Sequence, residues 1–164
     1  MGHIAKTTQL QIRVSGAEKR AIQRAAARAG LDMSGYVLSR VLSQPAREFQ
    51  DAAAACAGAE PRFALAELNS LLAGFSAGEL REAVGTAPTT TLAPFLANYL
   101  AAMVEVSCAR ADVPVPVWTR AVAPLSEPVF GSTLQSLRLH LLTQSPAAFR
   151  RRNLFIDATV GNRV

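Results

Sequence analysis

The sequence predicts a mainly α-helical protein, in which one strand and two helices form an N-terminal module and an all-α domain follows. Half of the 164 residues are hydrophobic, yet only 6% are aromatic, and alanine is abundant. This composition favours closely packed helices over a β-sandwich. Strict alternation of polar and apolar residues near the N-terminus indicates the strand. We expect a first domain over 1–45, a helical linker over 46–60 and a second domain over 61–164.

Residues 9–14 (QLQIRV) predict the strand, because every second side chain is apolar. The polar face of this strand consists of Gln9, Gln11 and Arg13. The sequence S-x-x-E at 15–18 is typical of a capping box, so a helix should begin at residue 16 or 17 and end at Gly30. Asp32 or Ser34 can cap a second helix, which should end near residues 43–44 because Pro45 follows.

Positive charge is concentrated in this first part of the chain. Residues 1–50 hold eight basic and three acidic residues, whereas residues 51–164 hold nine of each, so the first part accounts for the whole net charge of +5. A basic module joined to a neutral remainder predicts that the first part of the chain binds a polyanion and that the rest has a different function.

The N-terminal module is too small to be stable by itself. A single strand of about six residues leaves its N–H and C=O groups without partners, and two short helices cannot enclose a core. A second copy solves both problems, because two strands then pair antiparallel and four helices share one apolar face. We therefore expect a homodimer with a two-stranded ribbon at its surface, which fits the major groove of DNA.

Residues 7–44 resemble a ribbon-helix-helix DNA-binding domain, the class found in many bacterial repressors and antitoxins. The resemblance rests on the strand at 9–14, the capped first helix and the run GLDMSGY at 30–36. It implies that Gln9, Gln11 and Arg13 read base edges of double-stranded operator DNA. It also implies phosphate contacts at the start of the second helix, where free N–H groups and the helix dipole attract anions. The phosphate-contacting residues we predict are Lys6, Thr8, Met33, Ser34 and Gly35.

Helical patterns continue through most of the second half. Helices are expected over 46–57, from Phe63 to about Gly74, from an S-x-x-E start at 76–79 to Val84, and over 92–111. Alternating prolines make 112–117 extended. A short helix over 118–122, another from 131 or 132 to 144, and a start at Ser145 and Pro146 complete the pattern.

Three consecutive arginines near the C-terminus form a second basic cluster. Three interpretations remain open for it: a solvated basic turn, a contact with an acidic partner surface, or a second DNA contact. The stretch from 118–120 to 145–155, which includes SPAAFRRRN, resembles the C-terminal part of small antitoxin-type proteins paired with nucleotidyltransferase-like toxins. That resemblance implies a partner-binding surface formed by Phe149, Arg150, Arg151, Arg152 and Asn153. The N-terminal module is also similar to antitoxins paired with acetyltransferase toxins, although those carry shorter tails.

No motif of catalysis, metal binding or membrane insertion is present. The P-loop, dinucleotide-binding, zinc-protease and nucleophile-elbow patterns are missing, and His3 and His140 are the only histidines. Cys56 and Cys108 lack metal-ligand spacing and are expected to be reduced and buried. No apolar run reaches the ~20 residues of a membrane span, and the start of the chain lacks the apolar block of a secretion signal. We expect a cytoplasmic, non-enzymatic protein with no catalytic residues, metal, cofactor or membrane contact.

The sequence thus favours an antitoxin of a type II toxin–antitoxin system. Its ribbon would bind operator DNA as a dimer, and its C-terminal helices would neutralise a toxin enzyme, which the resemblance implies to be nucleotidyltransferase-like. The alternative is a ribbon-helix-helix transcriptional regulator whose C-terminal domain senses a ligand or forms oligomers, with no toxin. An enzyme is disfavoured, because no convergent acid, base, nucleophile or metal set is visible.

Overall fold

The computed structural model describes residues 11–41 and 44–157, and helices dominate both ranges, which confirms the prediction of a mainly α protein. The chain divides into an N-terminal unit, Met1–Gln44, and a C-terminal unit, Pro45–Val164. This boundary lies one residue before the end of the first domain expected from the sequence.

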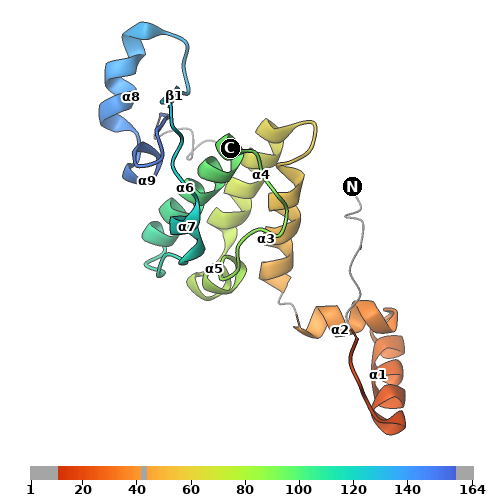
Figure 1. Cartoon of the computed structure of the whole chain (residues 1–164). Helices are drawn as coiled ribbons and strands as arrows, with labels where there is room; N and C mark the ends of the chain where they lie inside the picture. The colour runs from red at the N-terminus through yellow and green to blue at the C-terminus, as the bar shows by residue number, and fades with distance from the viewer. Residues whose placement is uncertain (1–10, 42–43, 158–164) are drawn as a thin grey trace. The chain divides into compact units, whose positions relative to one another are not determined.

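The N-terminal unit is a pair of helices, α1 (Gly16–Arg28) and α2 (Met33–Val41), joined by a tight turn (Figure 1). Gln9 and Leu10, which begin the predicted strand, lie outside the described residues. Residues 11–14 are described and form neither strand nor helix. A ribbon needs a strand from a second chain, so the predicted ribbon-helix-helix arrangement stays a prediction.

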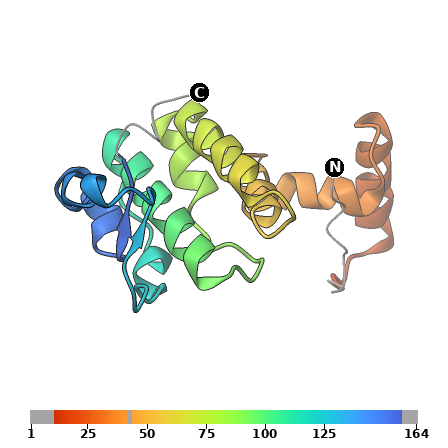
Figure 2. The same cartoon turned by 90° about the horizontal axis from the view of Figure 1, so that it is seen from above.

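The C-terminal unit is built around one long helix. Its elements are α3 (Gln44–Ala55), α4 (Pro61–Gly74), α5 (Ala77–Ala83), α6 (Pro94–Arg110), α7 (Trp118–Ala121), β1 (Val129–Phe130), the 3₁₀ turn η1 (Gln135–Leu137), α8 (Arg138–Gln144), α9 (Ala147–Arg150) and β2 (Leu154–Phe155). Figures 1 and 2 show α6 between α3–α5 on one side and α8–α9 on the other. Residues 100–105 of α6 are buried without a break, as expected of a helix enclosed on several sides.

The segment expected to be a helical linker instead contributes to the core. Phe49, Ala53 and Cys56 are fully buried in it. The ring of Phe49 lies 6.4 Å from that of Trp118, whose indole N–H donates to the carbonyl of Val84 at 2.8 Å. Residues 45–56 therefore belong to the C-terminal unit.

The C-terminal unit is also not purely helical. Strands β1 and β2 pair in parallel, with Val129 opposite Leu154 and Phe130 opposite Phe155. The two phenylalanine rings stack with centroids 5.0 Å apart. This short pairing ties the end of the described chain to the segment that follows α7.

Candidate nucleic-acid interface and the C-terminal arginines

The entry to α1 is fixed by the predicted capping box. The Ser15 hydroxyl accepts from the Glu18 N–H at 3.3 Å, and the Glu18 carboxylate accepts from the Ser15 N–H at 2.7 Å. Donation from the Ser15 backbone, and then from its hydroxyl, lowers the pKa of Glu18 below its usual 4.5. The cap fixes where α1 begins, directly after residues 11–14, which include the predicted base-contacting Gln11 and Arg13.

The turn between the two helices needs a left-handed residue, and Gly30 supplies it with φ +66°. The Leu31 N–H donates to the carbonyl of Ala26 at 3.1 Å, and the Gly30 N–H donates to that of Ala27 at 3.2 Å. These two bonds form a Schellman motif, which satisfies the last carbonyls of α1. The motif sets the direction in which α2 departs.

The start of α2 already holds a negative charge. The Asp32 carboxylate accepts from the Gly35 N–H at 2.7 Å, so Asp32, of the two predicted candidates, is the cap. A Cβ on residue 35 would lie 2.5 Å from that carboxylate oxygen, so glycine leaves room for the cap. The N–H groups of Met33 and Ser34 belong to the first turn and have no carbonyl one turn earlier within α2. A phosphate placed at Met33, Ser34 and Gly35 would therefore meet the Asp32 charge.

Both acidic residues of the described N-terminal unit, Glu18 and Asp32, are thus engaged by helix-cap N–H groups. None of its basic side chains forms an ion pair within the described part of the chain. The exposed basic residues of this unit are Arg13, Lys19, Arg20, Arg24, Arg28 and Arg40. Their charge is directed to solvent, apart from Arg40, whose guanidinium lies 5.3 Å from the centre of the Tyr36 ring.

The described part of the N-terminal unit has almost no core of its own. Ala26 is the one buried residue among those described before residue 42. Large apolar side chains are exposed instead: Ile12 is 59% exposed and Val41 is 70% exposed. Val14, Leu31 and Met33 are also exposed. Isolated apolar side chains on a surface are common, but a helix pair without a core needs further packing to be stable.

Of the predicted base-contacting residues, Gln11 and Arg13 are described and exposed. Gln9, and the predicted phosphate contacts Lys6 and Thr8, lie outside the described residues. The structure therefore places two predicted contacts beside the capped start of α1 and leaves three undescribed.

The predicted partner surface at residues 149–153 is partly internal, which differs from expectation. Arg152 is 5% exposed and Phe149 is 4% exposed. Phe149 packs edge-on against Tyr99 with ring centroids 5.2 Å apart. Asn153 adopts φ +57° and donates its side-chain N–H to the carbonyl of Leu125 at 2.6 Å. Only Arg150 and Arg151 remain exposed, so a contact with an acidic partner here reduces to these two side chains.

Arg152 joins three segments of the C-terminal unit. Its guanidinium donates to the Glu105 carboxylate at 2.6 Å and to the Thr119 carbonyl at 2.7 Å. Longer bonds of 3.3 Å reach the Asn98 side chain and the Val122 carbonyl, while the Nε atom has no partner among the described residues. The ion pair is buried, and the acceptors of Arg152 come from α6 and from α7 with its C-cap, so the guanidinium links these segments and is turned away from solvent.

Sequence reasoning missed Glu105, Asn98 and Thr119 as partners of this arginine. One signal was available: Glu105 is the single acidic residue within α6, a helix otherwise rich in apolar residues. A buried carboxylate requires a cation, because burying an isolated charge is costly. Burial raises the pKa of the Cys108 thiol, and the charge of the Glu105 carboxylate raises it further. Burial also raises the pKa of the Cys56 thiol. Both cysteines are buried and form no disulfide.

The described residues contain no cluster of three or more histidine, cysteine, aspartate or glutamate side chains arranged to hold a metal ion. Within the same ranges, no helix combines the length and apolar character that a membrane crossing requires.

Comparison with protein families gives a match over the first part of the chain. Residues 4–75 match the model of the NikA-like family, described as Mobilization protein NikA. The matched region is less than half of the chain, and it covers the N-terminal helix pair together with α3 and α4. No curated protein and no solved structure was found to match the chain.

Proposed function

We propose that this chain is a DNA-binding protein of DNA mobilization, and that it grips duplex DNA through a dimer of its N-terminal unit. In this proposal the chain binds and positions DNA and has no catalytic residues of its own. The observation that carries the proposal is that the N-terminal unit exposes basic and apolar side chains together. The basic side chains suit a polyanion, and the apolar side chains suit a second copy.

The apolar side chains support dimerisation through the strand. Ile12 and Val14 alternate with Gln11 and Arg13, so one face of a paired strand would be apolar and the other polar. Antiparallel pairing of two such strands would bury the apolar face over the helices of both copies. Gln11 and Arg13 would then face the major groove, where arginine pairs with guanine and glutamine with adenine.

The basic side chains of α1 and α2 would add contacts with phosphates. Such contacts fix the position of a protein on the duplex without selecting a sequence. Both acidic residues of the described unit are held in helix caps. They therefore do not compete with DNA phosphates for the arginines. Specificity in this proposal comes from the ribbon, and general affinity comes from the helices.

The match to Mobilization protein NikA directs the proposal to mobilization rather than to toxin neutralisation. An antitoxin or a repressor would use the same DNA-binding dimer. An antitoxin would in addition need a toxin-binding surface, and three of the five residues predicted for it, Phe149 and residues 152–153, already pack against or bond to other parts of the C-terminal unit. We therefore do not extend the proposal to a toxin.

The test is a fluorescence anisotropy titration of the full chain with a DNA duplex selected by that chain from a random library. Arg13→Ala should weaken binding to the selected duplex by about 1–3 kcal/mol and should weaken binding to an unselected duplex less. Arg81→Ala, which removes an exposed arginine from α5, is the matched control and should change neither affinity. Equal effects of Arg13→Ala and Arg81→Ala on the selected duplex would contradict the proposal.

A second variant tests the dimer, by sedimentation and by the same anisotropy titration. Ile12→Asp places a charge on the apolar face of the predicted strand, so it should shift the chain to monomers in sedimentation and abolish binding to the selected duplex. Val117→Asp, at an exposed position of the C-terminal unit, should do neither. A dimer that persists in Ile12→Asp would place the dimer contact elsewhere.

A further inference from the structure

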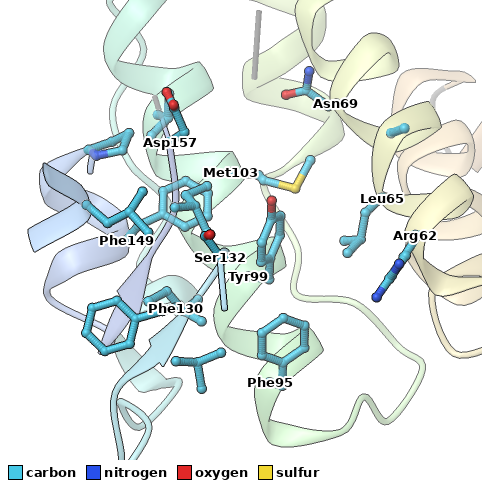
Figure 3. A pocket seen from close by; sticks show the side chains of 18 of the residues that line it. Arg62, Leu65, Asn69, Phe95, Tyr99, Met103, Phe130, Ser132, Phe149 and Asp157 are labelled. Carbon is cyan, nitrogen blue, oxygen red and sulfur yellow. The ribbon is translucent and has the colours of Figure 1, made fainter. Parts of the chain in front are cut away.

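The C-terminal unit contains a cavity of about 810 Å³ that the proposed DNA-binding function does not use. It is bounded by α4 and α6 and by the chain that runs from β1 through α8 and α9 to β2. Figure 3 shows Arg62 and Leu65 of α4 across from Phe95 and Tyr99 of α6. Cavities of roughly 300–1,000 Å³ are the size that binds small molecules.

The cavity walls are mainly apolar. Leu65, Met103, Phe149, Leu154 and Ile156 line it. Three of these side chains, Met103, Phe149 and Leu154, are buried, so they form the floor of the cavity rather than its rim. An apolar wall of this kind would gain from contact with an alkyl chain or ring, because that contact removes apolar surface from water.

A few polar groups converge on the same space. Arg62 lines the cavity from the first turn of α4 and forms no ion pair within the described ranges. Tyr99 is half-buried, and its hydroxyl makes no hydrogen bond to any described residue. Burial raises the pKa of Tyr99, so at neutral pH its hydroxyl is protonated and able to donate. The formal charges in the lining are those of Arg62, Arg110 and Asp157, which leave one net positive charge.

We propose that this cavity binds a small amphipathic monoanion, a carboxylate with an alkyl tail. The carboxylate would accept from the Arg62 guanidinium and the Tyr99 hydroxyl, and the tail would lie along Leu65, Met103 and Phe149. The charge of the lining selects an anion over a cation. The apolar floor selects a ligand with a tail over a small inorganic anion.

The test is calorimetric titration of the full chain with decanoate, below the concentration at which decanoate forms micelles. Decanoate should bind one molecule per chain, and octanoate should bind more weakly by about fourfold for each methylene removed. Decyltrimethylammonium, which has the same tail and the opposite charge, should not bind measurably. Absence of decanoate binding would overturn the proposal, and equal binding of decyltrimethylammonium would overturn its charge selection.

Variants of single side chains locate the ligand. Arg62→Gln should weaken decanoate binding by about tenfold or more, and Tyr99→Phe by about 2- to 12-fold while keeping the ring contact with Phe149. Ala66→Phe, at an exposed position of the lining, should obstruct the cavity without disturbing the core. Arg81→Gln, an exposed arginine outside the cavity, is the matched control. Decanoate binding that survives both Ala66→Phe and Arg62→Gln would place the ligand elsewhere and refute the assignment. The test does not depend on DNA binding, so the cavity proposal and the DNA-binding proposal can fail separately.

Discussion

Replacing Arg152 by methionine tests what the buried ion pair between Arg152 and Glu105 contributes to the stability of the C-terminal unit. The change keeps an apolar stem and removes the guanidinium, so four acceptors lose a donor: the Glu105 and Asn98 side chains and the Thr119 and Val122 carbonyls. Removing one partner of a buried pair costs about 3–5 kcal/mol, because the other charge stays buried without full compensation. Glu105 keeps its bond to Arg151 at 3.1 Å, which places the expected loss at the lower end of that range.

The single tryptophan provides a local readout. Trp118 precedes Thr119, whose carbonyl accepts from Arg152, and its indole is bonded to Val84. Denaturant unfolding followed by tryptophan fluorescence therefore reports the C-terminal unit alone. Arg152→Met should lower the midpoint by an amount equivalent to about 3 kcal/mol, with the slope unchanged.

Two further variants separate burial from charge. Arg151 also contacts Glu105, but its side chain is 72% exposed, so Arg151→Met should cost less than about 1 kcal/mol. The double variant Arg152→Met with Glu105→Met should recover much of the loss, since an apolar pair of similar volume can replace a buried ion pair. Equal losses of unfolding free energy for Arg151→Met and Arg152→Met would refute the assignment of the buried pair. A double variant that is less stable than either of its single variants would refute it as well.

Two predictions concern the N-terminal unit. Asp32→Asn keeps the cap on α2 but removes a negative charge beside the predicted phosphate contact, so affinity for an unselected duplex at low salt should rise by about two- to fivefold; an unchanged or lower affinity in anisotropy titrations would exclude a phosphate there. In the folded chain the pKa of Glu18 is lowered, so at neutral pH its carboxylate is ionised and the cap is in place. The carboxylate becomes protonated, and the cap is lost, as the pH falls below the usual 4.5 and through the lowered pKa. The Glu18 amide resonance should shift over that acid range, and Glu18→Gln should remove this shift while keeping the helix start; a resonance insensitive to acid would show that the capping box is not formed.

The features that could be predicted from the sequence are those whose physical cause lies within a few residues. Both S-x-x-E motifs, at 15–18 and 76–79, form the reciprocal bonds expected of capping boxes. Gly30 adopts the left-handed conformation that its position after α1 required. Donor and acceptor in these motifs are three to five residues apart, so the sequence alone brings them together.

The features that could not be predicted depend on contacts distant in sequence. Ser145 was expected to cap the helix after it, but its hydroxyl lies 2.6 Å from the Leu141 carbonyl and 2.7 Å from that of Ile156, so it joins the end of α8 to the chain beyond β2. The helix expected from residue 131 or 132 to 144 begins only with the 3₁₀ turn at 135; Gly131, at its expected start, instead donates its N–H to the Phe155 carbonyl of β2 at 2.8 Å. Arg152 reads as a surface residue until Glu105, in a helix far earlier in the chain, is placed beside it.

The same contrast explains why the net charge led to the proposed DNA-binding surface, while the arginines near the C-terminus did not lead to a second one. In the N-terminal unit each described acid accepts hydrogen bonds from nearby cap N–H groups, so it is held away from the arginines and their charge remains available to a polyanion. In the C-terminal unit the acid at 105 is held in a buried pair with Arg152 and also contacts the exposed Arg151. The basic residues of the N-terminal unit therefore predict a polyanion-binding surface, because the nearby described acids are already engaged by backbone. On that argument the salt dependence of DNA binding should follow the arginines of α1 and be insensitive to the buried Arg152.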